Sequence, residues 1–308
     1  MRRLYPRNLL EFERQFRTEE DCWLYLVRVR WPYGFRCPRC GLNRSWQLKR
    51  KLWQCQDCGA MASATAGTIF QDSHLPLRLW FRAIWWFTNQ KSGISALGMQ
   101  RALGIGSYRT AWTCLHKLRR AMVRPNREPL TGKVEVDETF IGGRRKGTRG
   151  GRRAGDKAIV LVAVERRRFG AGRVRFKRIP VATGDQLLQF VKQSVAYGST
   201  VITDGLPAYV GVLKPHGYIH ETEIGTNALP SLHRVAALLK RWLLGIYQGR
   251  VSWEQLDHYL DEYAFRFNRR TSASRGKLFY RLVQQAVSVE PMPYANLVKG
   301  HKTRRSEV

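Results

Sequence analysis

Four cysteines arranged as two Cys-x-x-Cys pairs constrain the fold of this 308-residue chain more than any other feature of its sequence. The pairs are Cys37 with Cys40 and Cys55 with Cys58, and a glycine follows each pair. Each such turn brings two thiolates within reach of one ion, and four thiolates complete a tetrahedral zinc site without leaving a catalytic position. The spacing therefore predicts a zinc ribbon that holds structural zinc.

Disulfide bonds and a redox-active pair are the alternative uses of these cysteines. Disulfides suit secreted chains, and the N-terminal sequence, which carries acids and lacks a continuous apolar core, is not a secretory signal. A redox pair does not require a second copy of the motif. The remaining cysteines, Cys22 and Cys114, lie in apolar helical runs and are expected to be buried thiols.

The charge of the chain is strongly positive throughout its length. It contains 54 Lys and Arg residues against 23 Asp and Glu residues, a formal net charge of +31 at pH 7. Such an excess predicts a large polyanionic partner. A membrane surface also attracts basic proteins, but no stretch has the length and purity of a spanning helix, since Arg78 and Arg82 interrupt the apolar run 75–88. We expect no membrane partner and an intracellular location.

In so basic a chain, carboxylates at the ends of apolar runs are notable. Residues 134–143 read VEVDETFIGG and contain Asp137, and residues 201–204 read VITD and end at Asp204, just before Gly205. Magnesium takes hard oxygen ligands and is usually held by one or two carboxylates together with substrate phosphates. Carboxylates for a metal and cations for a polyanion together predict metal-assisted phosphodiester chemistry on nucleic acid.

Residues 95–122 contain two helical patterns joined at 103–106, with Ser95 and Ser107 as expected N-caps. The second helix would place Ala111, Cys114, Leu115 and Leu118 inward and leave Tyr108, Arg109, Lys117 and Arg120 available to DNA. This pattern fits a helix-turn-helix, and it fits a plain helical hairpin equally well. The basic composition and the cysteine quartet upstream favour the DNA-binding interpretation.

After a linker at 125–132, the pattern changes to strands. Runs at 134–141 and 158–164 and an alternation around Val174 and Phe176 predict three neighbouring strands. A helix whose apolar side carries Leu187, Leu188, Val191 and Val195 follows, and then the strand that ends at Asp204. This order is that of a ribonuclease-H-like fold. The glycine-rich loop 142–156, which contains Arg144, Arg145 and Lys146, is either a hairpin tip or a clamp on the DNA backbone.

The expected fold class is α/β: a ribonuclease-H-like catalytic domain, with a mixed sheet and flanking helices, preceded by a zinc ribbon and a helix-turn-helix. The expected domains are 1–72 with an N-terminal helix and the ribbon, 73–128 with the helix-turn-helix, 129–285 with the catalytic fold, and 286–308 as a basic, poorly ordered tail.

Several segments together resemble the transposases of bacterial insertion sequences, in particular the ISXO-like subgroup with an N-terminal zinc ribbon and a DDE-type nuclease domain. The segments are CPRCG, CQDCG, GTIF, LPLRLWF, VEVDETFIGG, TDG, LLKRWLLGIYQG and FRFNRR, in the same order from about residue 22 to residue 270. The resemblance implies binding of double-stranded DNA at terminal inverted repeats, metal-dependent strand cleavage and strand transfer, a homodimer or higher assembly on DNA, and a nucleoid-associated location in the bacterial cytoplasm.

The resemblance also implies a catalytic set. Asp137 and Asp204 would be the first two carboxylates, holding Mg²⁺ or Mn²⁺. Aligning the segment LLKRWLLGIYQG with the family places His233 where a glutamate or asparagine is expected. It places Lys240, seven residues later, as the basic residue of the signature, which would contact a phosphate. Both would lie on one side of a helix over about 231–245. Imidazole is a poor ligand for Mg²⁺ and a better one for Mn²⁺, so His233 would bind metal or position water or phosphate.

Two further acids compete for the third position. Glu135 lies two residues before Asp137 and so points to the same sheet face, whereas Glu138 points to the other face if the strand continues. Two functional alternatives stay open at this stage. One is a transposase-derived DNA-binding protein without cleavage activity, in which His233 marks the loss of the third carboxylate. The other is a ribonuclease-H-like nuclease that does not join strands.

Overall fold

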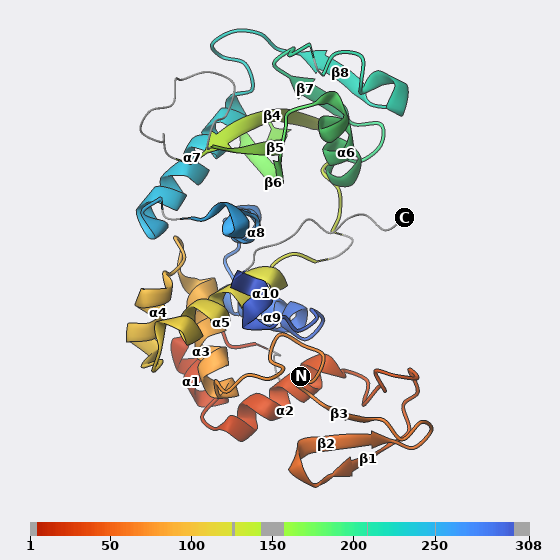
Figure 1. Cartoon of the computed structure of the whole chain (residues 1–308), viewed down its shortest axis with the longest axis vertical. Coiled ribbons are helices and arrows are strands. Elements are labelled where there is room, and N and C mark those ends of the chain that lie inside the picture. The colour runs from red at the N-terminus through yellow and green to blue at the C-terminus, as the bar shows by residue number, and fades with distance from the viewer. Residues whose placement is uncertain (1–4, 125–126, 143–156, 208, 250, 299–308) are drawn as a thin grey trace. The chain divides into compact units, whose positions relative to one another are not determined.

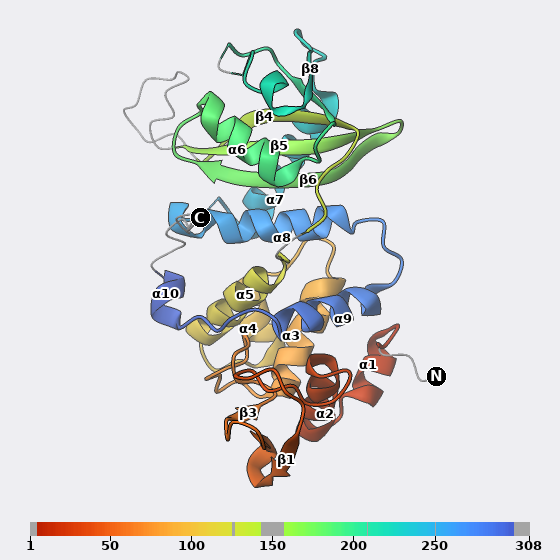
Figure 2. The same cartoon turned by 90° about the vertical axis from the view of Figure 1, so that its right-hand side faces the viewer.

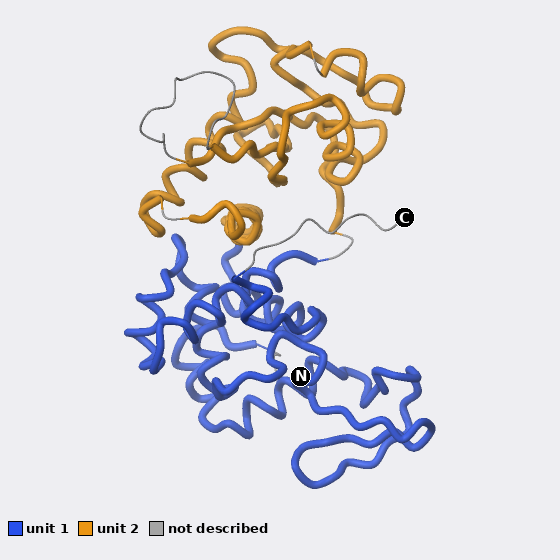
Figure 3. Tube along the Cα trace, viewed as in Figure 1, with its two compact units in different colours: residues 1–124, 272–298 blue, residues 125–271, 299–308 orange. Residues whose placement is uncertain are grey.

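The computed structural model describes residues 5–124, 127–142, 157–207, 209–249 and 251–298 (Figure 1). The chain divides into two compact units (Figure 3). The first comprises residues 1–124 and 272–298, and the second comprises residues 125–271 and 299–308. Each unit has its own core. Among the described residues, no helix is both long enough and apolar enough to span a bilayer.

The first unit combines a small sheet with a set of helices. Its elements are α1 (Leu9–Gln15), α2 (Glu19–Arg30), β1 (Ser45–Leu48), η1 (Lys49–Lys51), β2 (Leu52–Cys55), β3 (Met61–Ser63), α3 (Leu77–Asn89), α4 (Ala96–Leu103), α5 (Tyr108–Ala121), α9 (Arg275–Ala286) and α10 (Tyr294–Val298). The three strands form an antiparallel sheet in the order β1-β2-β3. Ser95 and Ser107 cap α4 and α5 as expected: the Ser95 hydroxyl accepts from the Gly98 N–H and the Ser107 hydroxyl from the Thr110 N–H, both at 3.1 Å.

An aromatic cluster forms the centre of this unit, and α9 supplies its middle ring. Phe279 is fully buried, and its ring centroid lies 5.5 Å from that of Phe12 and 5.7 Å from that of Phe81. Phe16 and Tyr25 complete the cluster. Aromatic pairs at such separations stabilise a core beyond the area they bury.

The expected domain limit at residue 285 and the expected tail from 286 differ from this arrangement. Residues 272–298 belong to the first unit, where α9 packs against α3 and α5, and α10 buries Leu297. The apolar stripe of α9 is readable from its sequence, but a stripe does not say which surface covers it.

The second unit is built on a five-stranded mixed sheet. Its elements are β4 (Lys133–Ile141), β5 (Ala158–Arg167), β6 (Gly170–Ile179), α6 (Gly184–Ser194), β7 (Thr200–Thr203), η2 (Lys214–His216), β8 (Ile219–Thr222), α7 (Pro230–Tyr247), η3 (Trp253–Gln255) and α8 (Leu256–Asn268). The strand order is β6-β5-β4-β7-β8; β4, β5 and β6 are antiparallel neighbours, and β7 and β8 run parallel to β4. The expected ribonuclease-H-like order of three strands, a helix and a further strand is confirmed.

Helices cover both faces of this sheet (Figures 1 and 2). Val134 and Val136 of β4 pack in one core with α6, while Val162 of β5 and Ile202 of β7 pack in the other with α7 and α8. Because side chains alternate along a strand, the odd-numbered residues of β4 face α7. Glu135 and Asp137 therefore belong to the α7 face of the sheet.

Candidate metal centres and catalytic site

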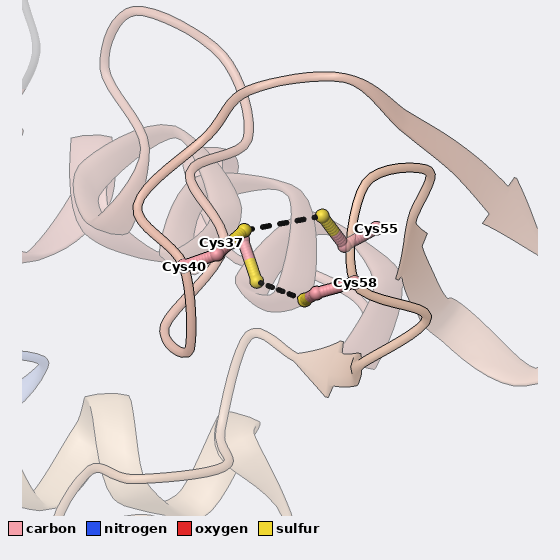
Figure 4. Close-up of side chains that lie close together, drawn as sticks. All are labelled: Cys37, Cys40, Cys55 and Cys58. Atoms are coloured by element: carbon pink, nitrogen blue, oxygen red, sulfur yellow. Dashed lines mark hydrogen bonds between the residues drawn. The ribbon is translucent and has the colours of Figure 1, made fainter.

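The four cysteines of the quartet converge from two equivalent turns (Figure 4). In each turn a glycine N–H donates to the carbonyl of the first cysteine, Gly41 to Cys37 at 2.9 Å and Gly59 to Cys55 at 3.0 Å. Both glycines have φ near +70°, at 76° and 69°, which a side chain disfavours. The repeat of the same local geometry explains why the two pairs present their sulfurs to one point.

The sulfur geometry fits a tetrahedral zinc ion. The four Sγ atoms all lie within 4.8 Å of one another, and the closest pairs, Cys37–Cys58 and Cys40–Cys55, are 3.6 Å apart. A Zn–S distance of about 2.3 Å gives a tetrahedron edge of about 3.8 Å. All four thiols are free of disulfides, as are the buried Cys22 and Cys114. The quartet is a structural zinc site.

Packing supports the ribbon from its inner face. Trp53 of β2 is 9% exposed; its ring stacks on Trp23 of α2 at 5.4 Å and meets Trp31 edge-on at 4.8 Å. The ribbon is therefore held both by its cysteines and by an aromatic contact with α2.

Asp137 lies in the middle of β4, not at its end as the sequence suggested, and Asp204 directly follows the neighbouring parallel strand β7. The pairing of β4 with β7 aligns Val134 with Val201 and Glu135 with Ile202. Continuing this register by two residues would bring Asp137 level with Asp204, and the Asp204 carboxylate is close enough to contribute to the raised pKa of Asp137. The adjacent Gly205 has φ of 83°, and a Cβ there would lie 2.6 Å from the Thr222 methyl carbon, so the turn after Asp204 requires glycine.

The environment of Asp137 disfavours its charge. The residue is 8% exposed. Burial, with further contributions from the carboxylates of Glu138 and Asp204, raises the pKa of Asp137 to about 7. A divalent cation bound between two partly buried carboxylates would remove the repulsion between their charges.

Backbone N–H groups next to the two aspartates hydrogen-bond their carboxylates. The Glu138 N–H donates to Asp137 Oδ1 at 2.8 Å, and the Leu206 N–H donates to Asp204 Oδ1 at 3.0 Å. Glu138 itself accepts from the hydroxyl of the buried Tyr209. Glu138 thus faces the α6 side of the sheet, as expected from strand alternation, and is tied to the segment that follows Asp204.

Glu135 has a different role from the one considered for it. It is fully buried, pairs with Arg166 at 2.7 Å and accepts the Leu232 N–H at 2.7 Å. Arg166 in turn holds Glu223 through two hydrogen bonds of 2.6 and 2.7 Å. Because Leu232 lies in the first turn of α7, this network fixes the start of the helix against β4. Because the Glu135 carboxylate is occupied by Arg166 and the Leu232 N–H, it does not supplement His233.

His233 and Lys240 both project from the exposed side of α7, separated by about 10 Å along the helix axis at roughly 1.5 Å per residue. The sheet-facing side of α7 carries the buried Leu232, Val235 and Leu239. Among the described residues, the cysteine quartet is the sole set of three or more metal-binding side chains with all ligand atoms within 4.8 Å. His233 therefore does not close a compact three-ligand cluster with the two aspartates.

Two family models match this chain in the same order as its two candidate metal centres. Residues 17–61 match a transposase zinc-ribbon domain, and residues 129–268 match an ISXO2-like transposase domain. The chain carries a transposase zinc ribbon and an ISXO2-like transposase domain. Its activity is that of a DDE-type DNA transposase.

One relative covers most of this transposase. The uncharacterized protein in transposable element ISH50 of Halobacterium salinarum is 27% identical over 289 residues, which are 85% of this chain and 94% of that protein.

Among solved structures, a chain of the simian T-cell lymphotropic virus intasome in complex with a PP2A regulatory subunit is 18% identical, with a TM-score of 0.34 over 60% of this chain and 64% of that one. A chain of the Mos1 strand transfer complex is 12% identical, with a TM-score of 0.30 over 68% of this chain and 75% of that one. Scores this low add nothing to the family assignment.

The residues expected to contact DNA on α5 of the transposase fall in different environments. Arg109 is exposed at the start of the helix, with its guanidinium 3.8 Å from the ring centroid of Tyr294. Lys117 is 8% exposed and donates to the Gln71 carbonyl at 3.3 Å, and burial lowers its pKa. The expectation of a DNA-facing Lys117 is wrong, because the second half of α5 packs inside the unit.

Arg120 of the transposase is half-buried and donates to the Glu290 carbonyl at 3.3 Å. Only the first turn of α5, with Tyr108 and Arg109, keeps the open surface expected of a recognition helix. Arg144, Arg145 and Lys146, proposed for the glycine-rich loop, lie outside the described residues.

Sequence reasoning missed two positioning groups of the transposase, the Glu135–Arg166–Glu223 network and the Tyr209 hydroxyl on Glu138. The one signal available for the first was a glutamate in an otherwise apolar strand two residues before Asp137. Nothing local marks Arg166, Glu223 or Tyr209, because their partners are distant in sequence.

Proposed function

We propose that this transposase binds the terminal inverted repeats of its own element and cuts and joins DNA strands there, with Asp137 and Asp204 holding Mg²⁺ or Mn²⁺. The observation that carries the proposal is the proximity of Asp204, directly after β7, to Asp137 of the neighbouring parallel strand β4, with the pKa of Asp137 raised to about 7. A bound divalent metal supplies Lewis acidity and a nucleophile of lowered pKa, which in-line attack on a phosphodiester needs.

Backbone and side-chain groups of the protein itself supply positioning. The Glu138 and Leu206 N–H groups orient the two carboxylates, and the Glu135 network sets the first turn of α7. From α7, Lys240 would contact a phosphate near the scissile bond as a point charge. His233 would position water or phosphate, or join the metal ligands when DNA is bound.

The first unit would recognise the DNA. The exposed first turn of α5 would enter the major groove, as the N-terminal residues of recognition helices do. The ribbon would add phosphate contacts from the exposed Lys49 and Arg50 between β1 and β2. Two element ends must be brought together, so we propose that a homodimer or higher assembly forms on DNA, in the cytoplasm and associated with the nucleoid.

Cleavage of terminal DNA tests the proposal. Labelled duplexes that carry the element end are incubated with Mg²⁺ or Mn²⁺ and the full chain. We expect nicks that disappear in Asp137→Asn and Asp204→Asn but persist in Asp185→Asn, an exposed acid on α6 that serves as the matched control. DNA binding with no nick in either metal would contradict it and favour a catalytically inactive DNA-binding protein.

A second assay separates a transposase from a nuclease of the same fold. Precut ends with a free 3′-hydroxyl are mixed with a supercoiled plasmid, and the joined products are sequenced. Strand joining at many plasmid positions is expected. Plasmid nicking without any joined end would limit the chain to hydrolysis.

A further inference from the structure

The catalytic unit contains a cavity of about 400 Å³ that shares Lys240 with the mechanism above and whose other lining residues have no part in it. It lies where the end of β4, the start of β5, the second half of α7 and the beginning of η3 and α8 come together. Its walls include Ile141, Leu244, Trp253 and Leu256, and Lys157 and Lys240 also line it. This volume is in the range of pockets that hold small organic ligands.

The apolar side of the pocket carries the Trp253 ring, which Arg178 contacts. Trp253 is 42% exposed, whereas tryptophan side chains are highly buried on average. The Arg178 guanidinium lies 4.8 Å from its ring centroid, and Asp257 holds Arg178 at 3.0 Å. A fixed, half-open indole beside aliphatic walls suits a flat aromatic group.

The charged side of the pocket calls for an anion. Lys157 and Lys240 lie close enough that Lys157, after burial, contributes to lowering the pKa of Lys240. No carboxylate among the described residues pairs with either ammonium group. Two like charges at one cavity are relieved by an anionic occupant. A purely apolar occupant, such as a side chain from a second copy of the chain, would leave this repulsion in place.

The pocket and Asp137 lie along the same strand, β4. Ile141 lies four residues after Asp137 on β4, about 13 Å away at roughly 3.3 Å per residue. Lys240 shares the exposed side of α7 with His233. A DNA strand whose phosphate reaches the two aspartates therefore has a neighbouring nucleotide within reach of the pocket.

We propose that this cavity is a nucleotide subsite: it takes one unpaired base of the DNA strand next to the scissile phosphate, with Trp253 as the stacking surface and Lys157 and Lys240 on the adjoining phosphate. The proposal rests on the proposed function, because the scissile phosphate defines which nucleotide is meant. Extruding a base from a duplex has a cost that a mismatch removes, and stacking on an aromatic side chain offsets it.

A mismatch scan tests the subsite without requiring cleavage. Terminal duplexes with one mismatched pair at successive positions around the cleavage site are titrated against the full chain without divalent metal. A mismatch at one position should tighten binding about ten-fold, since that pair need not be opened. Trp253→Ala should abolish this gain and Trp253→Phe should retain most of it. Phe169→Ala, which removes an exposed ring from the turn between β5 and β6, should leave it unchanged.

A second arm separates failure of the subsite from failure of the proposed function. A short single-stranded oligonucleotide is titrated against the native chain, Trp253→Ala and Lys157→Ala, with thermal unfolding as the check on folding. Binding should weaken about ten-fold in each variant, whether or not the native chain cuts its element ends.

Three results would overturn the subsite. One is a scan in which no mismatch tightens binding; another is a gain that survives in Trp253→Ala. The third is a Trp253→Ala chain that changes its oligomeric state in size-exclusion chromatography while its response to mismatches and single strands stays native. In that case the cavity is an interface between copies.

Discussion

Asp137 occupies a position in which its own charge is unfavourable, and this has a consequence for stability. Its pKa in the folded chain is about 7, above the ordinary value of 3.8. A carboxyl group with a raised pKa destabilises the fold once it ionises, so metal-free protein should lose stability as pH rises from about 4 to about 7. Functional sites commonly have this property because they are built for a ligand.

Replacing Asp137 by asparagine should remove that loss. In metal-free protein at pH 8, we expect Asp137→Asn to raise Tm by a few degrees, at about 2–4 °C per kcal/mol for a domain of this size. At pH 4.5 the two proteins should unfold alike. Calorimetry at both pH values measures the difference, and an equal effect at both would mean that repulsion among the carboxylates is not its source.

Glu135 illustrates a residue that acts through another element. Glu135→Ala should lower the free energy of unfolding by about 3 kcal/mol, because Arg166 loses the buried partner of its Nε and keeps only Glu223 among the described residues, and the Leu232 N–H loses its acceptor. Glu221→Gln, which breaks the exposed pair with Lys133, should cost less than 1 kcal/mol. Urea unfolding compares the two. Similar small effects in both variants would show that the network does not hold α7.

At the scale of elements, the zinc ribbon both binds the metal and packs against α2 through Trp53. The Trp53 ring stacks on Trp23 of α2, so loss of the metal should disturb this contact. We expect one zinc ion per chain by metal analysis. A strong chelator, or Cys40→Ser, should change tryptophan fluorescence and weaken DNA binding without unfolding the second unit. A zinc-free chain with native fluorescence would contradict the assignment.

The two halves of α5 should respond differently to substitution. Arg109→Ala should weaken binding to terminal DNA by about five- to one-hundred-fold, the usual range for a base or phosphate contact at a recognition helix. Lys117→Met should leave affinity unchanged and keep or raise stability, because Lys117 is buried with a lowered pKa. Fluorescence anisotropy measures both variants at one salt concentration. An affinity loss in Lys117→Met equal to that of Arg109→Ala would reverse this division.

For the whole molecule, the two units differ in whether one segment of the sequence or two segments form the core. The described residues of the second unit all fall within one stretch of the sequence, 127–271, whereas the first unit needs residues 272–298 in addition to 5–124 to complete its core. A fragment of residues 127–271 should therefore fold alone. A chain ended at residue 271 should lose the stability of the first unit, because Phe279 leaves the aromatic cluster. Two-step unfolding by circular dichroism would separate these effects, and a native first unit in the truncated chain would refute the prediction.

Much of the site was predictable because its signals are local. The cysteine turns and the caps at Ser95 and Ser107 depend on spacing over a few residues, which covalent geometry and hydrogen bonding fix directly. Asp137 and Asp204 stood out as acids in or directly after apolar runs, although Asp137 lies within β4 and not at its end. The ribonuclease-H-like strand order followed from the sequence of apolar runs, since neighbouring strands and one helix crossover leave few topologies.

Other features depend on which surfaces meet, and periodicity does not carry that information. The sequence by itself determined the zinc ribbon, because residue type and short spacing specify it, and the resemblance to insertion-sequence transposases gave the class of chemistry and singled out Asp137 and Asp204. Only the tertiary structure decided that α9 completes the first unit, that Lys117 is buried, that Glu135 holds α7, and that Trp253 and Lys240 share a cavity. The physical reason is that burial and pairing between residues far apart in sequence depend on packing, which a helical or strand pattern leaves undetermined.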